Sequence, residues 1–223
     1  MKIFANRLLS VSLFFFLAVS FSYAQPPGVN FFEGILEYKV DIKGAEASML
    51  LQNKPNNKMK MYIKGGNYIV HLMGGQLPKT FLFMEDSTFE YTIDMAGKRA
   101  FKISPYNIAK RGRKVPEAKN MGKSVVINGI SCDVYSMKTE DAIFTFYVND
   151  QYKADLSKYE GKKLAKAYFL IKGLEGMIPL KVIKKTRGLT ITNTISNIIP
   201  QEFDEAQFSI PHDFIIKRRD YRY

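Results

Sequence analysis

The sequence is poor in the residue types that most catalytic and metal sites use. Its 223 residues include one cysteine, two histidines and no tryptophan. A single cysteine, Cys132, excludes an intramolecular disulfide, so an apolar core must stabilise the fold. The histidines are His71, within an alternating segment, and His212, within the turn-like Pro211-His212-Asp213.

Sequence motifs of common catalytic sites are absent as well. There is no phosphate-binding loop, no HExxH, no GxSxG and no CxxC. Cys132 alternates with apolar residues, which favours a buried inert thiol over an activated nucleophile. A hydrolase built from scattered carboxylates such as Glu85, Asp86 and Glu90 is a less favoured alternative. We therefore expect no enzymatic activity and no cofactor.

One methionine and histidine pattern resembles a copper site. Met59-x-Met61 and His71-x-Met73 flank a two-glycine turn, and thioether and imidazole ligands suit copper. A two-residue turn, however, places the first pair on the sheet face opposite the second pair. The sequence therefore predicts no metal site, and the methionines are interpreted as core residues.

Long apolar runs are confined to the amino terminus. Lys2 and Arg7 precede an apolar stretch from Leu8 to Phe21, and small residues follow at Ser22 and Ala24. This order predicts a cleaved signal peptide over residues 1–24, and an uncleaved membrane anchor is the less favoured alternative. Residues 25–223 are expected to form one soluble, monomeric domain. Its expected location is the periplasm, with the cell surface or the exterior as alternatives.

Basic residues outnumber acidic ones. The chain has 33 Lys and Arg against 21 Asp and Glu; without Lys2 and Arg7 the net charge is 31 minus 21, or +10. Outside the cytoplasm an anionic membrane surface is a better candidate partner than nucleic acid, and simple solvation of the charges is the alternative. The candidate membrane-surface residues are Lys110, Arg111, Arg113 and Lys114 in a loop, and Lys217, Arg218 and Arg219 in the tail.

Period-two alternation dominates the rest of the chain and predicts eleven short strands. They are Glu33–Ile42, Lys58–Lys64, Asn67–Met73, Lys79–Glu85, Thr88–Asp94, Lys98–Ile103, Ser124–Ile127, Ile130–Met137, Ala142–Val148, Leu180–Thr186 and Leu189–Ile198. Tight-turn signals separate many of them. The sequence thus predicts a mainly β fold (α+β), a single curved antiparallel sheet.

Two segments interrupt the alternation. Ser104–Lys123 is basic and lacks periodicity, which predicts a long loop. Asp155–Tyr168 has apolar residues at roughly helical spacing, with Asp155 as a candidate N-cap, which predicts one amphipathic helix. Gly161 lies inside that helix and weakens the pattern.

Some strands are apolar on both faces. Phe81 and Phe83 share a face with the polar Thr88, Glu90 and Thr92, and 144–148 is apolar or aromatic on both sides. A sheet with one solvated face alternates more cleanly, so a helix or a bound apolar molecule should cover the second face. The candidate ligand-binding residues are Phe81, Phe83, Phe144 and Phe146.

Four short segments, in this order, carry a resemblance to a known family. They are FEGILEY at 32–38, NGISCDVY at 128–135, IPLK at 178–181 and FSIPHDF at 208–214. With them the chain resembles an uncharacterised bacterial exported family related to the LolA-like lipoprotein carriers. GLEGMI at 173–178 is faintly similar to a second exported family, named for a Gly-Leu-Pro-Gly-Leu-Ile motif. The first resemblance implies an open half-barrel whose concave face is covered by one or a few helices and holds lipid or acyl chains.

These observations lead to one expected function and one alternative. The expected function is non-catalytic binding of an apolar ligand, such as a lipid or a lipoprotein acyl chain, in the cell envelope. The alternative is an envelope interaction protein with a filled core and no small ligand, acting through its basic surface loops.

The signal segment predicts a mature protein that begins at Gln25. We expect amino-terminal sequencing of the protein from its own host to start there, and the protein to fractionate with soluble envelope contents. Recovery of a chain that retains Leu8–Val19 would contradict the prediction.

The basic clusters predict weak, salt-sensitive adhesion to anionic vesicles. Each well-placed basic residue contributes about 1 kcal/mol, and salt screens the attraction beyond a Debye length. Cosedimentation should therefore occur at low salt and disappear at high salt. Binding that is indifferent to salt, or missing at low salt, would exclude this mode of adhesion.

Overall fold

The computed structural model describes residues 31–44, 55–75, 78–87, 89–103, 116–159 and 168–218, which form a single twelve-stranded sheet. The strands are β1 (Gly34–Lys43), β2 (Lys58–Lys64), β3 (Asn67–Met73), β4 (Lys79–Phe83), β5 (Glu90–Asp94), β6 (Arg99–Ile103), β7 (Lys119–Ile127), β8 (Ile130–Lys138), β9 (Ile143–Lys153), β10 (Met177–Thr186), β11 (Leu189–Pro200) and β12 (Ile215–Arg218). Three 3₁₀ helices complete the described elements: η2 (Leu156–Tyr159), η3 (Tyr168–Leu170) and η4 (Glu205–Phe208).

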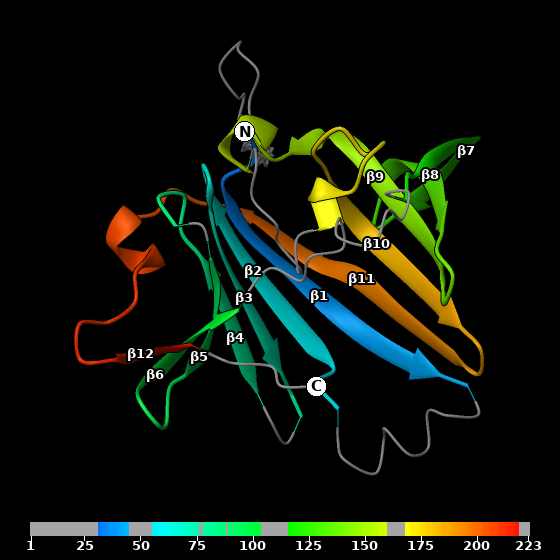
Figure 1. Cartoon of the computed structure of the whole chain (residues 1–223). Helices are drawn as coiled ribbons and strands as arrows, with labels where there is room; N and C mark the ends of the chain where they lie inside the picture. Colours follow the sequence, from blue (N-terminus) through cyan, green and yellow to red (C-terminus); the bar gives the residue numbers. More distant parts are fainter. Residues whose placement is uncertain are drawn as a thin grey trace, which may run out of the picture.

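The sheet consists of two antiparallel meanders joined at one seam. The strand order is β12-β6-β5-β4-β3-β2-β1-β11-β10-β9-β8-β7. Strands β1 to β6 form one meander and β7 to β11 the other, and β1 pairs with β11 along its whole length. Figure 1 shows the sheet curving so that the two meanders stand on either side of β1 and β11. The sheet does not close, because β12 and β7 remain its edges.

Strand β1 shows how the alternation of the sequence selects the two faces. Tyr38 is buried and Val40 and Ile42 are partly buried on the concave face, whereas the intervening Lys39 and Asp41 are exposed. Successive side chains of a strand point to opposite faces, so this alternation turns the apolar set inward. A bulge between Glu37 and Tyr38 adjusts the register against β11.

All eleven predicted strands are present, with ends that shift by a few residues. The predicted register of the first hairpin is confirmed: Lys64 pairs with Asn67, Tyr62 with Ile69 and Lys60 with His71. Its turn is Gly65-Gly66, and Gly65 has φ +52°, in the left-handed region that glycine adopts without strain. The hydrophobic pattern and the turn thus specify the same register.

The single amphipathic helix predicted over Asp155–Tyr168 is not what the described part of that segment forms. The described part of that segment contains only the short 3₁₀ helices η2 and the start of η3, and residues 160–167 lie outside the described residues. Asp155 does cap η2, because its Oδ1 accepts a hydrogen bond from the Ser157 backbone N at 3.0 Å. Tyr159 is buried while Leu156 is 39% exposed. Leu156 and Tyr159 therefore do not share one buried face, and no α-helix covers the concave face in the described part of the chain.

Two strands differ from the prediction: one is longer than expected and one was not expected. Strand β7 begins at Lys119, inside the segment predicted as loop, and residues 104–115 lie outside the described residues. The residues of β7 are exposed up to Ile127, so no buried face produced an alternating pattern. Strand β12 was not predicted and pairs parallel to β6. Ile215 and Ile216 are 62% and 51% exposed, so periodicity gave no signal there either.

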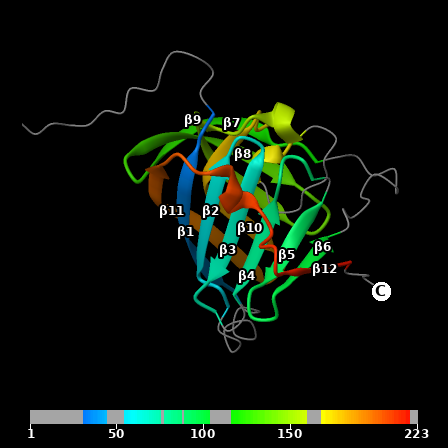
Figure 2. The same cartoon turned by 90° about the vertical axis from the view of Figure 1, so that its left-hand side faces the viewer.

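The convex face has its own apolar cover. Figure 2 shows η4 lying outside β2 and β3. The segment that carries η4 buries Phe203 and Phe208 against Leu82, Tyr91 and other residues of the sheet. Lys64 donates a hydrogen bond to the Phe203 carbonyl, and Glu33 Oε1 accepts one from the Phe203 backbone N at 3.0 Å. A covered second face, as the doubly apolar strands predicted, is therefore present on the Leu82 side. No helix among the described residues is long and apolar enough to cross a membrane.

The concave core contains a buried polar pair. Tyr68 is fully buried and donates its hydroxyl to Glu90 Oε1 at 3.0 Å, and Glu90 is 2% exposed. Burial, followed by the negative charge of Glu90, raises the pKa of Tyr68 above its ordinary value of 10.0. Burial also raises the pKa of Tyr159, which lies beside Tyr68.

This pair predicts alkaline destabilisation. The raised pKa of Tyr68 means that the folded state keeps a proton that the unfolded state releases. The contribution of this proton to the free energy of unfolding should be fully present below pH about 10, and the free energy of unfolding should fall as the pH rises above that value. Tyr68→Phe should weaken that decline and cost about 1–3 kcal/mol at neutral pH, since Glu90 loses a donor.

Chemical denaturation across the pH range checks the prediction, with Tyr135→Phe, a change at a half-buried tyrosine, as the control. The control should keep the alkaline decline of the parent. An identical decline in Tyr68→Phe would refute the role given to Tyr68.

Candidate functional site

The concave face is organised in rows of side chains that cross several strands. Residues directly opposite each other in paired strands share a face, so the register defines each row. We call the first the Asn193 row: Val40, Asn193, Val182, Phe146 and Tyr135. The next along the strands is the Lys184 row: Ile42, Ile191, Lys184, Phe144 and Met137.

Exposure increases from one row to the next. Before the Asn193 row, Tyr38, Ile195 and Met59 are all buried. In the Asn193 row Val182 and Phe146 are buried but Val40 is only half-buried. In the Lys184 row every member except Met137 is partly exposed. The concave face is therefore an apolar surface that is closed at one end and open to solvent at the other.

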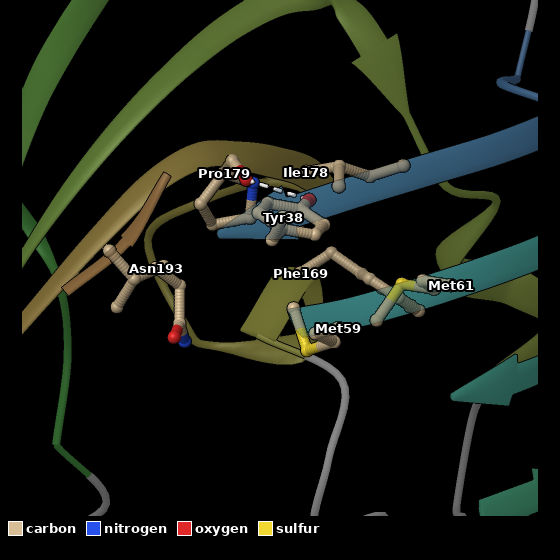
Figure 3. A pocket seen from close by; sticks show the side chains of 8 residues that line it. Tyr38, Met59, Met61, Phe169, Ile178, Pro179 and Asn193 are labelled. Carbon is tan, nitrogen blue, oxygen red and sulfur yellow. Dashed lines mark hydrogen bonds between the residues drawn. The ribbon is translucent and has the colours of Figure 1, made fainter. Parts of the chain in front are cut away.

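A small cavity lies at the closed end. It is about 10 Å³ in volume, roughly the room that one water molecule needs. Tyr38 lines this cavity, and its hydroxyl donates a hydrogen bond to the Pro179 carbonyl oxygen at 3.0 Å (Figure 3). The cavity is lined by Tyr38, Met59, Met61, Phe169, Ile178, Pro179, Val182 and Asn193.

The cavity is small because two aromatic side chains from outside the sheet fill the closed end. Phe169 of η3 is 1% exposed and lies beside Met59 and Met61 (Figure 3). Tyr159 of η2 packs against Phe169, with ring centroids 5.3 Å apart, and against Phe83 at 5.8 Å. These two rings take the covering role that the sequence assigned to a helix.

Two polar contacts hold η2 onto the hairpin turns. The Tyr159 hydroxyl donates to the Gly65 carbonyl at 3.2 Å. The Lys158 ammonium lies 2.8 Å from Glu85 Oε1, and Glu85 Oε2 accepts from the Gly66 backbone N at 3.2 Å. The Lys158–Glu85 pair is largely exposed, and such pairs contribute little. Aromatic packing therefore dominates the attachment of η2.

The four predicted phenylalanines lie on the concave face but in two places. Phe83 and Phe81 pair with Tyr68 and Val70, and Phe83 stacks on Tyr68 with centroids 5.4 Å apart. Phe144 and Phe146 stack with each other at 6.0 Å, on the other side of the seam. None of the four lines the cavity, and Phe144 is the one that is partly exposed.

His71 and Cys132, which the sequence analysis considered as candidate reactive residues, have different hydrogen-bond partners in the structure. His71 Nδ1 lies 2.8 Å from Thr80 Oγ1, and burial lowers the pKa of His71. Cys132 is buried, and burial raises the pKa of its thiol. Among the described residues no group of three or more His, Cys, Asp or Glu is placed to hold a metal.

The predicted membrane-surface residues are only partly covered by the structure. Lys110, Arg111, Arg113, Lys114 and Arg219 lie outside the described residues. Lys217 is exposed on β12, next to the exposed Ile216, and Arg218 ends that strand. Adhesion through these residues stays a prediction.

Sequence reasoning missed Asn193, Phe169 and Tyr38. Asn193 follows Thr192 in a strand whose polar residues looked solvent-facing, and only its partners on β1 and β10 place it on the concave face. Phe169 directly follows the segment predicted as a helix, Asp155–Tyr168. Tyr38 looked like an ordinary strand residue.

No family model and no curated protein matches the sequence. Solved structures with a related arrangement include an uncharacterised conserved protein from Thermus thermophilus, with a TM-score of 0.48 and 12% identity over 84% of this chain and 91% of that one. LprF from Mycobacterium bovis has a TM-score of 0.33 and 11% identity over 82% of this chain and 90% of that one. The Mycobacterium tuberculosis lipoprotein LppX has a TM-score of 0.36 and 9% identity over 77% of this chain and 89% of that one. With TM-scores below 0.5, these likenesses identify neither a family nor a function for this chain.

Proposed function

We propose that this protein is a non-catalytic envelope protein that binds an apolar ligand, such as a lipid or a lipoprotein acyl chain, on the concave face of its sheet. The increase in exposure along the rows of that face supports the proposal. Ile42, Ile191 and Phe144 are apolar, face inward and stay partly exposed. An apolar surface that is left open at one end of a half-barrel is what a bound chain would cover.

The ligand enters the closed end by taking the place of Phe169. A cavity of about 10 Å³ holds no acyl chain, so the ring must move outward. Exposing a buried Phe side chain costs roughly 1.5–3 kcal/mol, and each buried CH₂ group returns about 0.8 kcal/mol. About four methylene groups therefore offset the loss, which any common acyl chain supplies. η3 is a three-residue 3₁₀ helix, so little regular structure resists the movement.

The packing of the other meander favours the second candidate function, an interaction protein with a filled core. Phe83 is fully buried between Tyr68 and Tyr159 and leaves no space. On this interpretation Phe169 is a permanent part of the core, and the protein would act through its surface. The two functions differ in what happens when Phe169 is shortened.

Phe169→Ala distinguishes them. If the closed end accepts a ligand, the substitution should increase uptake of a neutral apolar dye, N-phenyl-1-naphthylamine, several-fold per folded molecule. Phe208→Ala is the matched control, since Phe208 is equally buried but belongs to the convex cluster. Each substitution should lower the free energy of unfolding by about 3–5 kcal/mol or less. Dye titrations and unfolding curves measure both effects.

Phe83→Ala and Phe146→Ala extend the same measurement. Severe destabilisation with unchanged dye uptake would assign each residue to the core, whereas a mild loss of stability with reduced uptake would assign it to the ligand site. Native mass spectrometry of protein from its own host adds a direct readout, because a bound chain appears as added mass. Equal dye uptake by Phe169→Ala and Phe208→Ala, with no added mass, would refute ligand binding.

A further inference from the structure

Asn193 is a buried amide in an apolar setting. It is 9% exposed and lines the cavity together with apolar side chains. Its cross-strand neighbours are Val40 on β1 and Val182 on β10. No hydrogen bond is made by its side chain among the described residues, in which no fully enclosed side-chain nitrogen or oxygen is left without a partner. The amide is therefore not fully enclosed, and Asn193 lies at the edge of the cavity, with its amide end turned away from Tyr38 and Phe169 (Figure 3).

Stability does not explain an asparagine at this position. Asn is disfavoured in strands where Val and Ile are favoured, and its neighbours across the strands are apolar. A β-branched or aliphatic residue would continue the apolar rows on both sides. The amide makes no hydrogen bond among the described residues, so it is free to bond to a polar group of a ligand bound at this face.

Lys184 supplies a positive charge on the same face. It lies in the next row, two residues along the strands, and successive same-face residues are about 6.6–7 Å apart. Lys184 is partly exposed, and its Nζ lies 5.7 Å from the centroid of the Phe144 ring. Its ammonium thus lies over Phe144 on β9, near the end that is open to solvent, and must turn across β10 towards β11 to meet a group that Asn193 binds.

We infer that Asn193 and Lys184 together select an amphiphile with a single acyl chain and a carboxylate head group. The inference rests on the proposed function and names its ligand class. The chain lies along Tyr38, Met59 and Met61 in the place of Phe169. The carboxylate accepts a hydrogen bond from the Asn193 amide and pairs with the Lys184 ammonium. A hydrocarbon of the same length meets the apolar surface but leaves the amide unpaired.

Displacement of N-phenyl-1-naphthylamine from the full mature chain tests the selection. The competitors are dodecanoate, methyl dodecanoate and dodecane, which share a chain length and differ in the head group. Asn193→Leu keeps the volume and removes the hydrogen bond. It should weaken dodecanoate binding about tenfold, the effect of losing a hydrogen bond to a charged group. Dodecane binding should not weaken and should tighten to the extent that dodecane leaves the amide unpaired in the parent, and the melting temperature should not fall.

Three further variants separate the contributions. Lys184→Met should weaken the binding of dodecanoate and leave the binding of methyl dodecanoate unchanged, because only the acid carries a charge. Asn197→Leu and Lys185→Met are controls of the same residue types on β11 and β10, both exposed and neither lining the cavity. They should bind all three competitors as the parent does.

The outcomes distinguish this inference from the proposed function. If the parent binds neither the dye nor any competitor, both are overturned. If dye and dodecane bind, but Asn193→Leu leaves the ratio of dodecanoate to dodecane affinity unchanged, apolar binding stands and the selection is wrong. A fall in that ratio in Asn193→Leu but not in Asn197→Leu supports the selection. If Asn193→Leu unfolds, Asn193→Val, which suits a strand, replaces it in the same comparison.

Discussion

The seam between β1 and β11 is the constraint on which the rest of the structure depends. It is the pairing that joins the amino-terminal meander to the carboxy-terminal one, across ten residues of β1. Such long-range pairing must overcome the entropy of closing a long loop before its contacts stabilise anything. The Asn193 row exists only because this seam places Val40 opposite Asn193. A register slip by one residue would turn that row to the outer face.

Both faces of one meander are covered, whereas part of the other is not. Phe203 and Phe208 cover the convex face behind β3 to β5, and Tyr159 and Phe169 cover the concave face in front. At the seam Ile42 and Ile191, and beyond it Phe144, remain partly exposed. The described part of the chain therefore has a filled region, which stabilises it, and a partly exposed apolar region, where the proposed function places the ligand. The proposed function places the exchange between ring and ligand at the boundary of the two, at Phe169.

The open sheet must also avoid pairing with other chains at its edges. β7 carries Lys119 and Lys123 and a register irregularity between Asn120 and Ser124, and β12 is only four residues long with Lys217 exposed. Charges, bulges and short strands at sheet edges are the usual means of discouraging such pairing. Basic residues at these positions thus have a physical role that is independent of any membrane.

The sequence by itself determined eleven of the twelve described strands, the turn at Gly65-Gly66 and the register of the first hairpin, because period-two burial and a two-residue turn are local properties that agree with each other. It also placed Phe81 and Phe83 on one face with Glu90, as the pairing shows. Only the tertiary structure decided what lies on those faces. Tyr159 of η2 and Phe169 of η3 both pack against Tyr68, a contact between segments far apart in the chain, and β12 depends on its pairing with β6. The pairing of Asn193 with Val40 on β1 and Val182 on β10 places it on the concave face. The sequence near Asn193 could not show this, because β1 lies far away in the chain.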